Sequence, residues 1–511
     1  MSHCKTKKSI DLLKVEKACI DQAFVKNLIT NDRCRSIRQS DLPLDITESG
    51  QVFCLEADLV WDQSGPAISA LEVNNLIIRA NHHTITITNP DGFIFNIHGS
   101  ENVRLEGFNL IGQTIGNNPG SAITISSSSN VIIEDLILKE LFFAPVLLDS
   151  INGLVLKNVF YTNSSYSTAF LPPIIVAQLL TNYAIFNVFL EQSAISIDGV
   201  NGFVHNINVN QQITTDSPNL VVTGVNLVDI FNLTMSKVNI NIVQDAVVNT
   251  LAGLFVTGII GSSSVTDLNI NIVQTALVEN SGGVVIQSGQ NSKFSEMNIL
   301  FSEQNNNSVG LVIIDSITGS RFQDNNIQNA GIGIFFDNSQ GNSFLNNKIH
   351  NASGSPTIGI AVINSATSNE INFNTITGTV VAITGSLPGG SPSSGNLVYQ
   401  NRIFGNQQAF SDMAQNELRD NIVFNNPAAL STPSDKKNAN VDDANVDDAN
   451  TKAKDANSKA NDTNVNNANS KANDINVNNA KEIKLLDFST ALEFLKAVRT
   501  KTTKKSKNVP K

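Results

Sequence analysis

Two aspartates, Asp315 and Asp337, have the spacing in this sequence that best suits chemistry. Each closes a short apolar run, and the two runs lie in consecutive copies of a repeat. If the copies stack as strands, equivalent side chains lie about 4.8 Å apart. Two carboxyl groups separated by about 5 Å can serve as the acid and the nucleophile of a retaining glycosidase. Their repulsion would favour a proton on one of them. Alternatively, the two carboxylates could bind a Ca²⁺ ion.

The same two residues also have a structural interpretation, which the sequence favours. Asp315-Ser-Ile-Thr-Gly and Asp337-Asn-Ser-Gln-Gly both have the composition of polar turns, in which Asp hydrogen-bonds to nearby backbone. The equivalent position is polar in other copies as well, where it is occupied by His98, Ser126, Asp149, Gln178, Asp198, Gln287 and Asn364.

Other residue types offer less. His82, His83 and His98 are close in sequence, but no Cys or carboxylate lies at ligand spacing beside them, so we expect histidines in surface turns. No nucleophile elbow, P-loop, zinc-protease helix or EF-hand loop occurs. Phenylalanines that recur at apolar positions are expected to form the core: Phe93, Phe95, Phe108, Phe203, Phe294, Phe322, Phe335, Phe344 and Phe373.

Internal repeats must position these residues. The hexapeptide Asn239–Gln244 recurs unchanged at Asn269–Gln274, and later copies share an Asn-x-Ile signature at spacings of 22 to 27 residues. About twelve copies fit between Leu71 and Phe424. Within a copy the apolar residues alternate, which predicts strands, and a unit this short buries its apolar face only by stacking. We therefore predict an all-β, single-stranded, right-handed parallel β-helix of about 12 coils, with Asn ladders at its turns.

The run Asn325–Ile334 resembles the repeats of the pectate-lyase-like superfamily of right-handed parallel β-helices, in particular carbohydrate-binding and sugar-hydrolase repeats. The resemblance covers roughly residues 60–425 and implies the fold. It also implies that a polysaccharide lyase or glycoside hydrolase is possible in this class. The motifs of the family's lyases and polygalacturonases are absent, however: Arg402-Ile403-Phe404 has Phe where an R-I-K motif has Lys, and Glu134-Asp135 is the one adjacent carboxylate pair in a coil.

Charge is distributed unevenly over the 511 residues. Residues 61–434 contain 10 basic and 25 acidic side chains, whereas residues 435–511 contain 15 basic and 11 acidic ones. So few cations argue against binding of nucleic acid or an acidic polysaccharide by the central region.

The two ends differ from the middle in composition. We predict an N-terminal helical cap and lead-in over 1–59, with an amphipathic helix at 9–30, and a parallel β-helix over 60–430. Residues 431–480 form a low-complexity Asn/Ala/Asp/Lys linker without a core. Residues 481–511 are predicted to form a short amphipathic helix with a basic tail, suited to a membrane surface or a partner. Its apolar face consists of Phe488, Leu492, Leu495 and Val498.

All four cysteines lie near the N-terminus, at Cys4, Cys19, Cys34 and Cys54. Their spacing fits no zinc or redox motif. Two disulfides are possible, but free thiols are favoured. No apolar run is long enough to span a membrane and no signal peptide is evident, so we expect a soluble chain.

These observations lead to three hypotheses about function. The favoured one is a non-catalytic β-helix scaffold for structural, adhesive or glycan-contacting interactions, without a cofactor. The second is a polysaccharide lyase or glycoside hydrolase that uses Asp315 and Asp337, with Ca²⁺ as a conceivable ion. The third is an effector addressed to a host membrane or partner protein by its C-terminal helix. The sequence leaves the ligand and the oligomeric state open.

Overall fold

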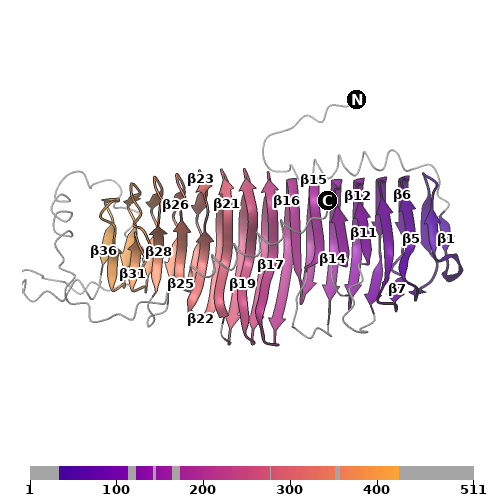
Figure 1. Ribbon diagram of the computed structural model, residues 1–511, viewed down its shortest axis with the longest axis horizontal. Helices are drawn as coiled ribbons and strands as arrows, with labels where there is room; N and C mark the ends of the chain where they lie inside the picture. The colour runs from indigo at the N-terminus through magenta and orange to yellow at the C-terminus, as the bar shows by residue number, and fades with distance from the viewer. Residues whose placement is uncertain are drawn as a thin grey trace, which may run out of the picture.

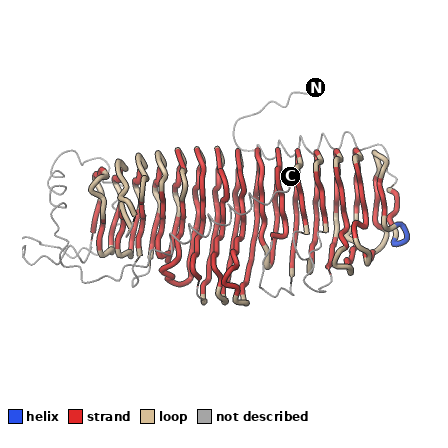
Figure 2. Tube along the Cα trace, in the orientation of Figure 1, coloured by secondary structure: helices blue, strands red, loops and turns tan. Residues whose placement is uncertain are grey.

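The computed structural model describes residues 34–112, 122–141, 145–163, 173–276, 278–351, 357–387 and 390–424, which form one long rod (Figure 1). Thirty-six strands belong to a single continuous sheet, and each named strand pairs in parallel with its neighbours one coil away. In this part of the chain the only helix is a 3-10 turn at Gln39–Asp41 (Figure 2). The predicted all-β parallel β-helix is confirmed.

Three faces run the length of the rod. Face A contains β1 (Arg35–Ile37), β3 (Val52–Leu55), β6 (Asn74–Arg79), β9 (Glu101–Glu106), β24 (Arg321–Gln323), β26 (Ser343–Leu345), β29 (Glu370–Asn372), β32 (Leu397–Tyr399) and β35 (Glu417–Arg419). Face B contains β4 (Leu59–Trp61), β7 (Thr84–Ile87), β10 (Asn109–Gly112), β27 (Lys348–His350), β30 (Thr375–Thr377), β33 (Arg402–Phe404) and β36 (Ile422–Phe424). Face C contains β2 (Leu44–Ile46), β5 (Gly65–Leu71), β8 (Gly92–His98), β11 (Ile123–Ser126), β13 (Val146–Asp149), β28 (Ile358–Ile363), β31 (Val381–Thr384) and β34 (Gln408–Ser411).

In the middle of the rod the strands are longer and most of them continue around a corner from one face to the next (Figure 1). These strands are β12 (Ser129–Lys139), β14 (Asn152–Thr162), β15 (Pro173–Glu191), β16 (Ala194–Ile213), β17 (Ser217–Phe231), β18 (Thr234–Gln244), β19 (Val248–Gly261), β20 (Ser264–Gln274), β21 (Val278–Gln290), β22 (Lys293–Ile313) and β25 (Asn326–Asp337). A short strand, β23 (Ile317–Thr318), lies at the corner between faces C and A.

Residues with positive φ make these corners, which explains the recurrence of asparagine. Where face A meets face B, the turn falls on Asp135, Asn158, Asn187 and Asn206, with φ between 55° and 56°. Asn and Asp tolerate this left-handed conformation better than other side chains. Their side chains also form a ladder: Asn158 donates to Asp135 at 2.7 Å, and Asn187 and Asn206 extend it at 2.9 Å. The predicted asparagine ladder is confirmed.

A second kind of ladder lies inside the C-terminal third and accounts for the Asn-x-Ile signature. Asn325 donates to Asn347 at 2.9 Å, and the series continues through Asn374 and Asn401 to Asn421 at 2.9 to 3.0 Å. Each acceptor oxygen also takes the backbone N–H of the preceding member. Burial of these amides is tolerated because the ladder satisfies both their oxygens and their nitrogens.

The inward side chains form a continuous apolar core. Phe294, Phe322 and Phe344 stack in successive coils with ring centroids 5.2 and 5.0 Å apart. The predicted core position is wrong for Phe373, which occupies a positive-φ corner and is 48% exposed. Of the other predicted phenylalanines, two are only half-buried, Phe93 and Phe203, and six are buried, Phe95, Phe108, Phe294, Phe322, Phe335 and Phe344.

Close packing explains the glycine that recurs with the 30-residue repeat. A Cβ on Gly283 would lie 2.4 Å from Cγ2 of Ile299 and 2.6 Å from the carbonyl oxygen of Gly310. No side chain fits there, because the strand of face C lies directly against an isoleucine of face B. The same contact recurs along the rod at Gly224, Gly253, Gly310, Gly333 and Gly359.

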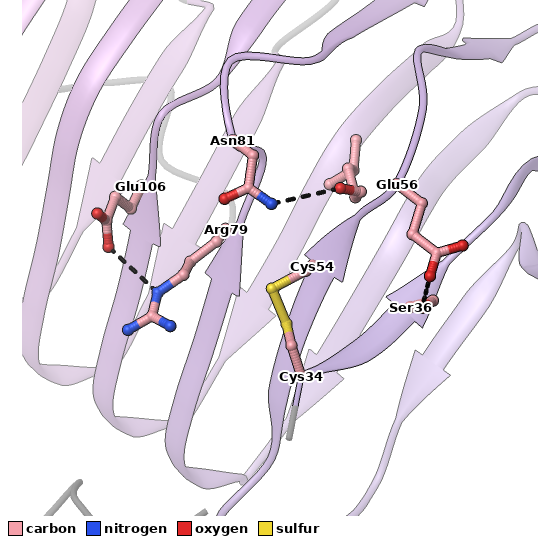
Figure 3. Close-up of a disulfide and its surroundings, with 8 residues drawn as sticks. Cys34, Ser36, Cys54, Glu56, Arg79, Asn81 and Glu106 are labelled. Atoms are coloured by element: carbon pink, nitrogen blue, oxygen red, sulfur yellow. Dashed lines mark hydrogen bonds and ion pairs between the residues drawn. A yellow bond between two sulfur atoms is a disulfide. The ribbon is translucent and has the colours of Figure 1, made fainter. Parts of the chain in front are cut away.

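The first coil corrects the cysteine prediction. Cys34 and Cys54 form a disulfide between the segment preceding β1 and strand β3 (Figure 3). The prediction of free thiols is therefore wrong for Cys34 and Cys54. The register explains the bond, since Ser36 pairs with Cys54 and the two chain segments lie side by side.

Several predictions fall outside the described residues. These are Cys4, Cys19, the helix at 9–30, the linker at 431–480 and the helix with its basic tail at 481–511. The strands of the solenoid begin at Arg35, within the segment that we assigned to a cap and lead-in. Among the described residues there is no helix of the length and apolarity that a membrane crossing requires.

Candidate functional site

The structure separates the two aspartates that the sequence suggested as a pair. Ile313 pairs with Phe336, so Asp337 is in register with the residue before Asp315. The predicted stacking of Asp315 on Asp337 is therefore wrong by one residue. Asp315 instead has a φ of 57° and occupies the corner position, as Asn364 does two coils later. Composition cannot distinguish the last strand residue from the corner residue, because both are polar.

Asp337 is buried, and it forms hydrogen bonds with residues of its own coil and of the next coil. Asn364 donates to its carboxylate at 2.5 Å, and the hydroxyl of Ser339 donates to its backbone carbonyl at 2.8 Å. These contacts are those expected of a residue that organises a turn. Among the described residues, no group of three or more His, Cys, Asp or Glu side chains is arranged to hold a metal ion.

The earlier part of the predicted polar column does stack. His98, Ser126, Asp149 and Gln178 occupy equivalent positions in four consecutive coils. His98 Nδ1 lies 2.9 Å from the hydroxyl of Ser126. This column is confirmed in register, and it ends where a bulge shifts the pairing of β15 with β16.

A carboxylate pair that the sequence did not suggest lies beyond this bulge. Burial, and then the charge of Asp229, raise the pKa of Asp198, while a hydrogen bond from the backbone N–H of Leu179 lowers it. Burial and the charge of Asp198 also raise the pKa of Tyr183, whose hydroxyl is buried without a hydrogen-bond partner. Asp229 accepts the backbone N–H of Ile259 at 3.0 Å. Register shifts on both sides of Asp229 hid the pair from a repeat alignment.

A cluster of five charges lies on the outer side of face A. Arg79, Glu106, Glu134 and Lys157 are in register in four consecutive coils. Buried Glu134 contacts both Lys157 and Arg104, while Glu106 lies 3.5 Å from Arg79 and 3.3 Å from Arg104 (Figure 3 shows the Arg79–Glu106 pair). Each charge has an oppositely charged partner within the cluster, whose three cations and two carboxylates leave a net charge of +1.

Face B carries a column of outward asparagines. Asn208, Asn239, Asn269, Asn298 and Asn326 are in register in five consecutive coils. Asn239 donates to Asn208 at 3.0 Å, Asn269 donates to Asn239 at 3.1 Å, and Asn326 donates to Asn298 at 2.8 Å. All five side chains are exposed or half-buried. We call this column the amide track.

The amide track continues into aromatic residues and is accompanied by a second column. Phe189 precedes Asn208 in register, and Phe160 precedes Phe189. The two rings stack with centroids 5.0 Å apart, and Phe160 is 39% exposed. Two residues along the same strands, Asn271 donates to Asn241 at 2.8 Å. The repeated Asn-Ile-Asn tripeptide was visible in the sequence, but which face it occupied was not.

Comparison with known proteins finds similar solved structures, and the three described here share 12% identity or less with the chain. No protein-family model and no curated protein matches the sequence. Among solved structures, the chain is similar to the periplasmic alginate epimerase AlgG, with 12% identity, coverage of 70% of this chain and 77% of that chain, and a TM-score of 0.31. It is similar to the A-module of mannuronan C-5 epimerase AlgE6 from Azotobacter vinelandii, with 12% identity, coverage of 80% and 94%, and a TM-score of 0.29. The Streptococcus pneumoniae surface protein and adhesin PfbA gives 11% identity, coverage of 82% and 95%, and a TM-score of 0.28.

Proposed function

We propose that the chain is a non-catalytic, elongated β-helix that contacts glycans through the amide track of face B. The observation that carries the proposal is the regular series of outward carboxamides at Asn208, Asn239, Asn269, Asn298 and Asn326. An amide has two N–H donors and an oxygen with two acceptor sites. An amide inside the ladder, such as Asn239, uses one donor and one acceptor for its neighbours, which leaves one of each for a ligand.

The spacing and the flanking rings suit an extended sugar chain. Neighbouring amides are one strand spacing apart, about 4.8 Å, along the axis of the rod. Hydroxyl groups both donate and accept, so a glycan lying along this axis can bond to successive amides. Phe160 and Phe189 would stack against the apolar face of a sugar at one end of the track.

Charge favours a neutral glycan over an acidic one. Residues 61–434 contain 25 acidic and only 10 basic side chains, so the rod repels a polyanion. The track itself consists of uncharged residues in all five coils. We therefore expect binding of neutral polysaccharides in preference to uronate polymers.

The test is a glycan array probed with the full chain and with a double variant, Asn239→Leu with Asn269→Leu. Each lost hydrogen bond contributes about 0.5–1.5 kcal/mol, so affinity should fall about 10-fold for the pair. The matched control is Thr234→Leu with Ser264→Leu, which changes outward residues of face A in the same coils. Equal binding by the full chain and the track variant, or an equal loss in the control, would contradict the proposal.

The competing proposal is a polysaccharide lyase or glycoside hydrolase. The feature in its favour is Asp198, whose pKa is raised by burial and then by the charge of Asp229 in the next coil, and which in turn raises the pKa of the buried Tyr183 hydroxyl. Release of reducing ends from bound glycans, abolished by Asp198→Asn or Asp229→Asn, would establish it. Abolition by Asp315→Asn or Asp337→Asn would instead support the aspartates predicted from sequence, and a rise in melting temperature on adding Ca²⁺, lost in Asp337→Asn, would support a bound ion.

A further inference from the structure

The C-terminal end of the rod exposes the inside of the solenoid. The last coil contributes one inward side chain from each face: Phe410 from β34, Leu418 from β35 and Val423 from β36. One coil earlier, their register partners are fully buried, at 0% exposure for each. Val423, by contrast, is 42% exposed, and Phe410 and Leu418 are only partly buried against the core. These three residues define the open end.

Further apolar side chains surround this end on face B. Phe404 and Phe424 are in register in the last two coils and are 39% and 55% exposed. Ile422 lies beside them at 46% exposure. Strand β36 pairs with β33 on one side, and no described strand lies on its other side. An unpaired edge next to exposed core residues is a surface that proteins normally cover.

We infer that the chain's own segment Leu485–Val498 docks on the open end and closes it. Repeat proteins need a terminal cap whose outer face is polar, and an amphipathic helix supplies one. Helical spacing would place the apolar residues Phe488, Leu492 and Leu495 of this segment on one face, and Thr490 and Ala497 on the opposite one. The proposal rests on the exposed last coil and is independent of the function proposed for the amide track.

Chain length and charge favour this segment over a second copy of the chain. Sixty residues separate Phe424 from Leu485, which is ample chain length for the segment to reach the last coil. Tethering makes the docking intramolecular, so a contact as small as one coil suffices, whereas a stable dimer needs about 800 Å² from each partner. The cations that follow the segment, Arg499 to Lys511, are also opposite in charge to the acidic body.

The experiment compares amide hydrogen exchange in three full-length chains. Leu492→Lys with Leu495→Lys places charge on the apolar face, and Thr490→Lys with Ala497→Lys places the same charge on the opposite face. We expect exchange in β34, β35 and β36 to be about 10-fold faster in the first variant and unchanged in the second. Exchange in β1 and β3 must stay unchanged in both, which shows that the solenoid remains folded.

A photo-crosslinker at position 492 identifies the occupant directly. Crosslinks to β35 or β36 of the same molecule support the proposal, and position 490 should give few. Three outcomes overturn it: no difference in exchange among the three chains, crosslinks between differently labelled molecules, or crosslinks to an added vesicle of anionic lipid in place of the solenoid. The second would indicate a second copy at the open end, and the third would indicate a membrane anchor.

Discussion

The two ends of the rod differ in how far the described residues cover their last strands and core side chains. At the N-terminal end, the side chain of Gln39 donates to the carbonyl of Val60 at 2.7 Å and accepts its N–H at 2.8 Å. Among the described residues β4 pairs with β7 on one side only, and this amide occupies the place of a strand on the other side. The disulfide Cys34–Cys54 ties the first coil to its neighbour, and Trp61 of β4 is buried. We call this end of the rod the closed end. At the C-terminal end, β36 has no described neighbour beyond β33, and Val423 is exposed.

This difference shows that pairing alone does not complete a solenoid. Both ends have the same strand register and the same inward apolar column. The repeated coil pattern therefore does not by itself cover the terminal strand at either end. Closure comes from residues outside the repeat, which at the N-terminal end are a 3-10 turn and a crosslink. Unpaired edges invite association, so each end must be finished by something specific. Stability in such a rod is local, and each end can be weakened by itself.

The largest expected effect is removal of Trp61 from the closed end. Trp61 is 2% exposed, and its indole N–H donates to the carbonyl of Gly65 at 2.9 Å. Trp61→Ala leaves a cavity and should lower the local opening free energy of β3 and β4 by about 3–5 kcal/mol. Phe424→Ala at the open end, where the ring is exposed, should cost less than about 0.5 kcal/mol. Hydrogen exchange measures both, and similar losses would remove the distinction between the ends.

Loss of the disulfide ranks second. The bond closes a loop with a sequence separation of 20, for which chain entropy predicts a stabilisation of about 3 kcal/mol. Cys34→Ala with Cys54→Ala should therefore accelerate proteolysis of the first coils, as reduction of the full chain should. Cleavage near β33 and β36 serves as the internal control and should not change. Equal acceleration at both ends would mean that the rod unfolds as one unit.

Much of this fold was predictable from sequence because the offset between repeat copies equals the register between neighbouring strands. The 30-residue offset that aligns Asn239 with Asn269 is the observed register of β18 and β20. The Asn-x-Ile signature marks buried amides, and recurring glycines mark close packing against isoleucine. Period-two alternation and a fixed offset are enough to assign such residues to equivalent positions in successive coils.

The features that could not be predicted from the sequence lie mostly where the repeat is interrupted. A single-residue ambiguity at a corner misplaced Asp315 relative to Asp337, and bulges concealed Asp198 and Asp229. The Cys34–Cys54 pairing depends on where the first strand begins, which no repeat copy indicates. The amide track lies in repeated residues, but its role as a surface depends on which side of the strand faces out. Alternation gives two faces without naming them.

The third prediction concerns the amide that closes the edge of β4. Gln39→Leu removes both hydrogen bonds to Val60 and should lower the opening free energy of β4 by about 1–2 kcal/mol. Gln407→Leu near the open end is the matched control and should have no measurable effect. Exchange of the Val60 amide proton reports the change directly. An unchanged rate would show that Gln39 does not substitute for a strand.

The smallest effect is a pH dependence confined to the closed end. Asp58 accepts the backbone N–H of Thr84 at 2.8 Å and lies 3.2 Å from Nδ1 of His83. The hydrogen bond from Thr84, and then that from His83, hold the pKa of Asp58 below its ordinary value of 3.8. A lowered carboxyl pKa gives stability that is complete above the ordinary pKa and is lost as the pH falls through the lowered one.

Acid should therefore lower the local opening free energy of β4 and β7. The difference in opening free energy between the two ends should become smaller between about pH 5 and pH 3. Asp58→Asn keeps an oxygen for Thr84 but removes the charge, so exchange in β4 and β7, corrected for intrinsic rates, should depend less on pH than in the native chain. The same substitution at Asp420 tests the open end and should leave the acid response of β4 intact. If Asp58→Asn responds to acid as the native chain does, this carboxylate does not stabilise the closed end. The acid sensitivity must then come from other groups. The difference in stability between the two ends would then rest on Gln39, Trp61 and the disulfide alone.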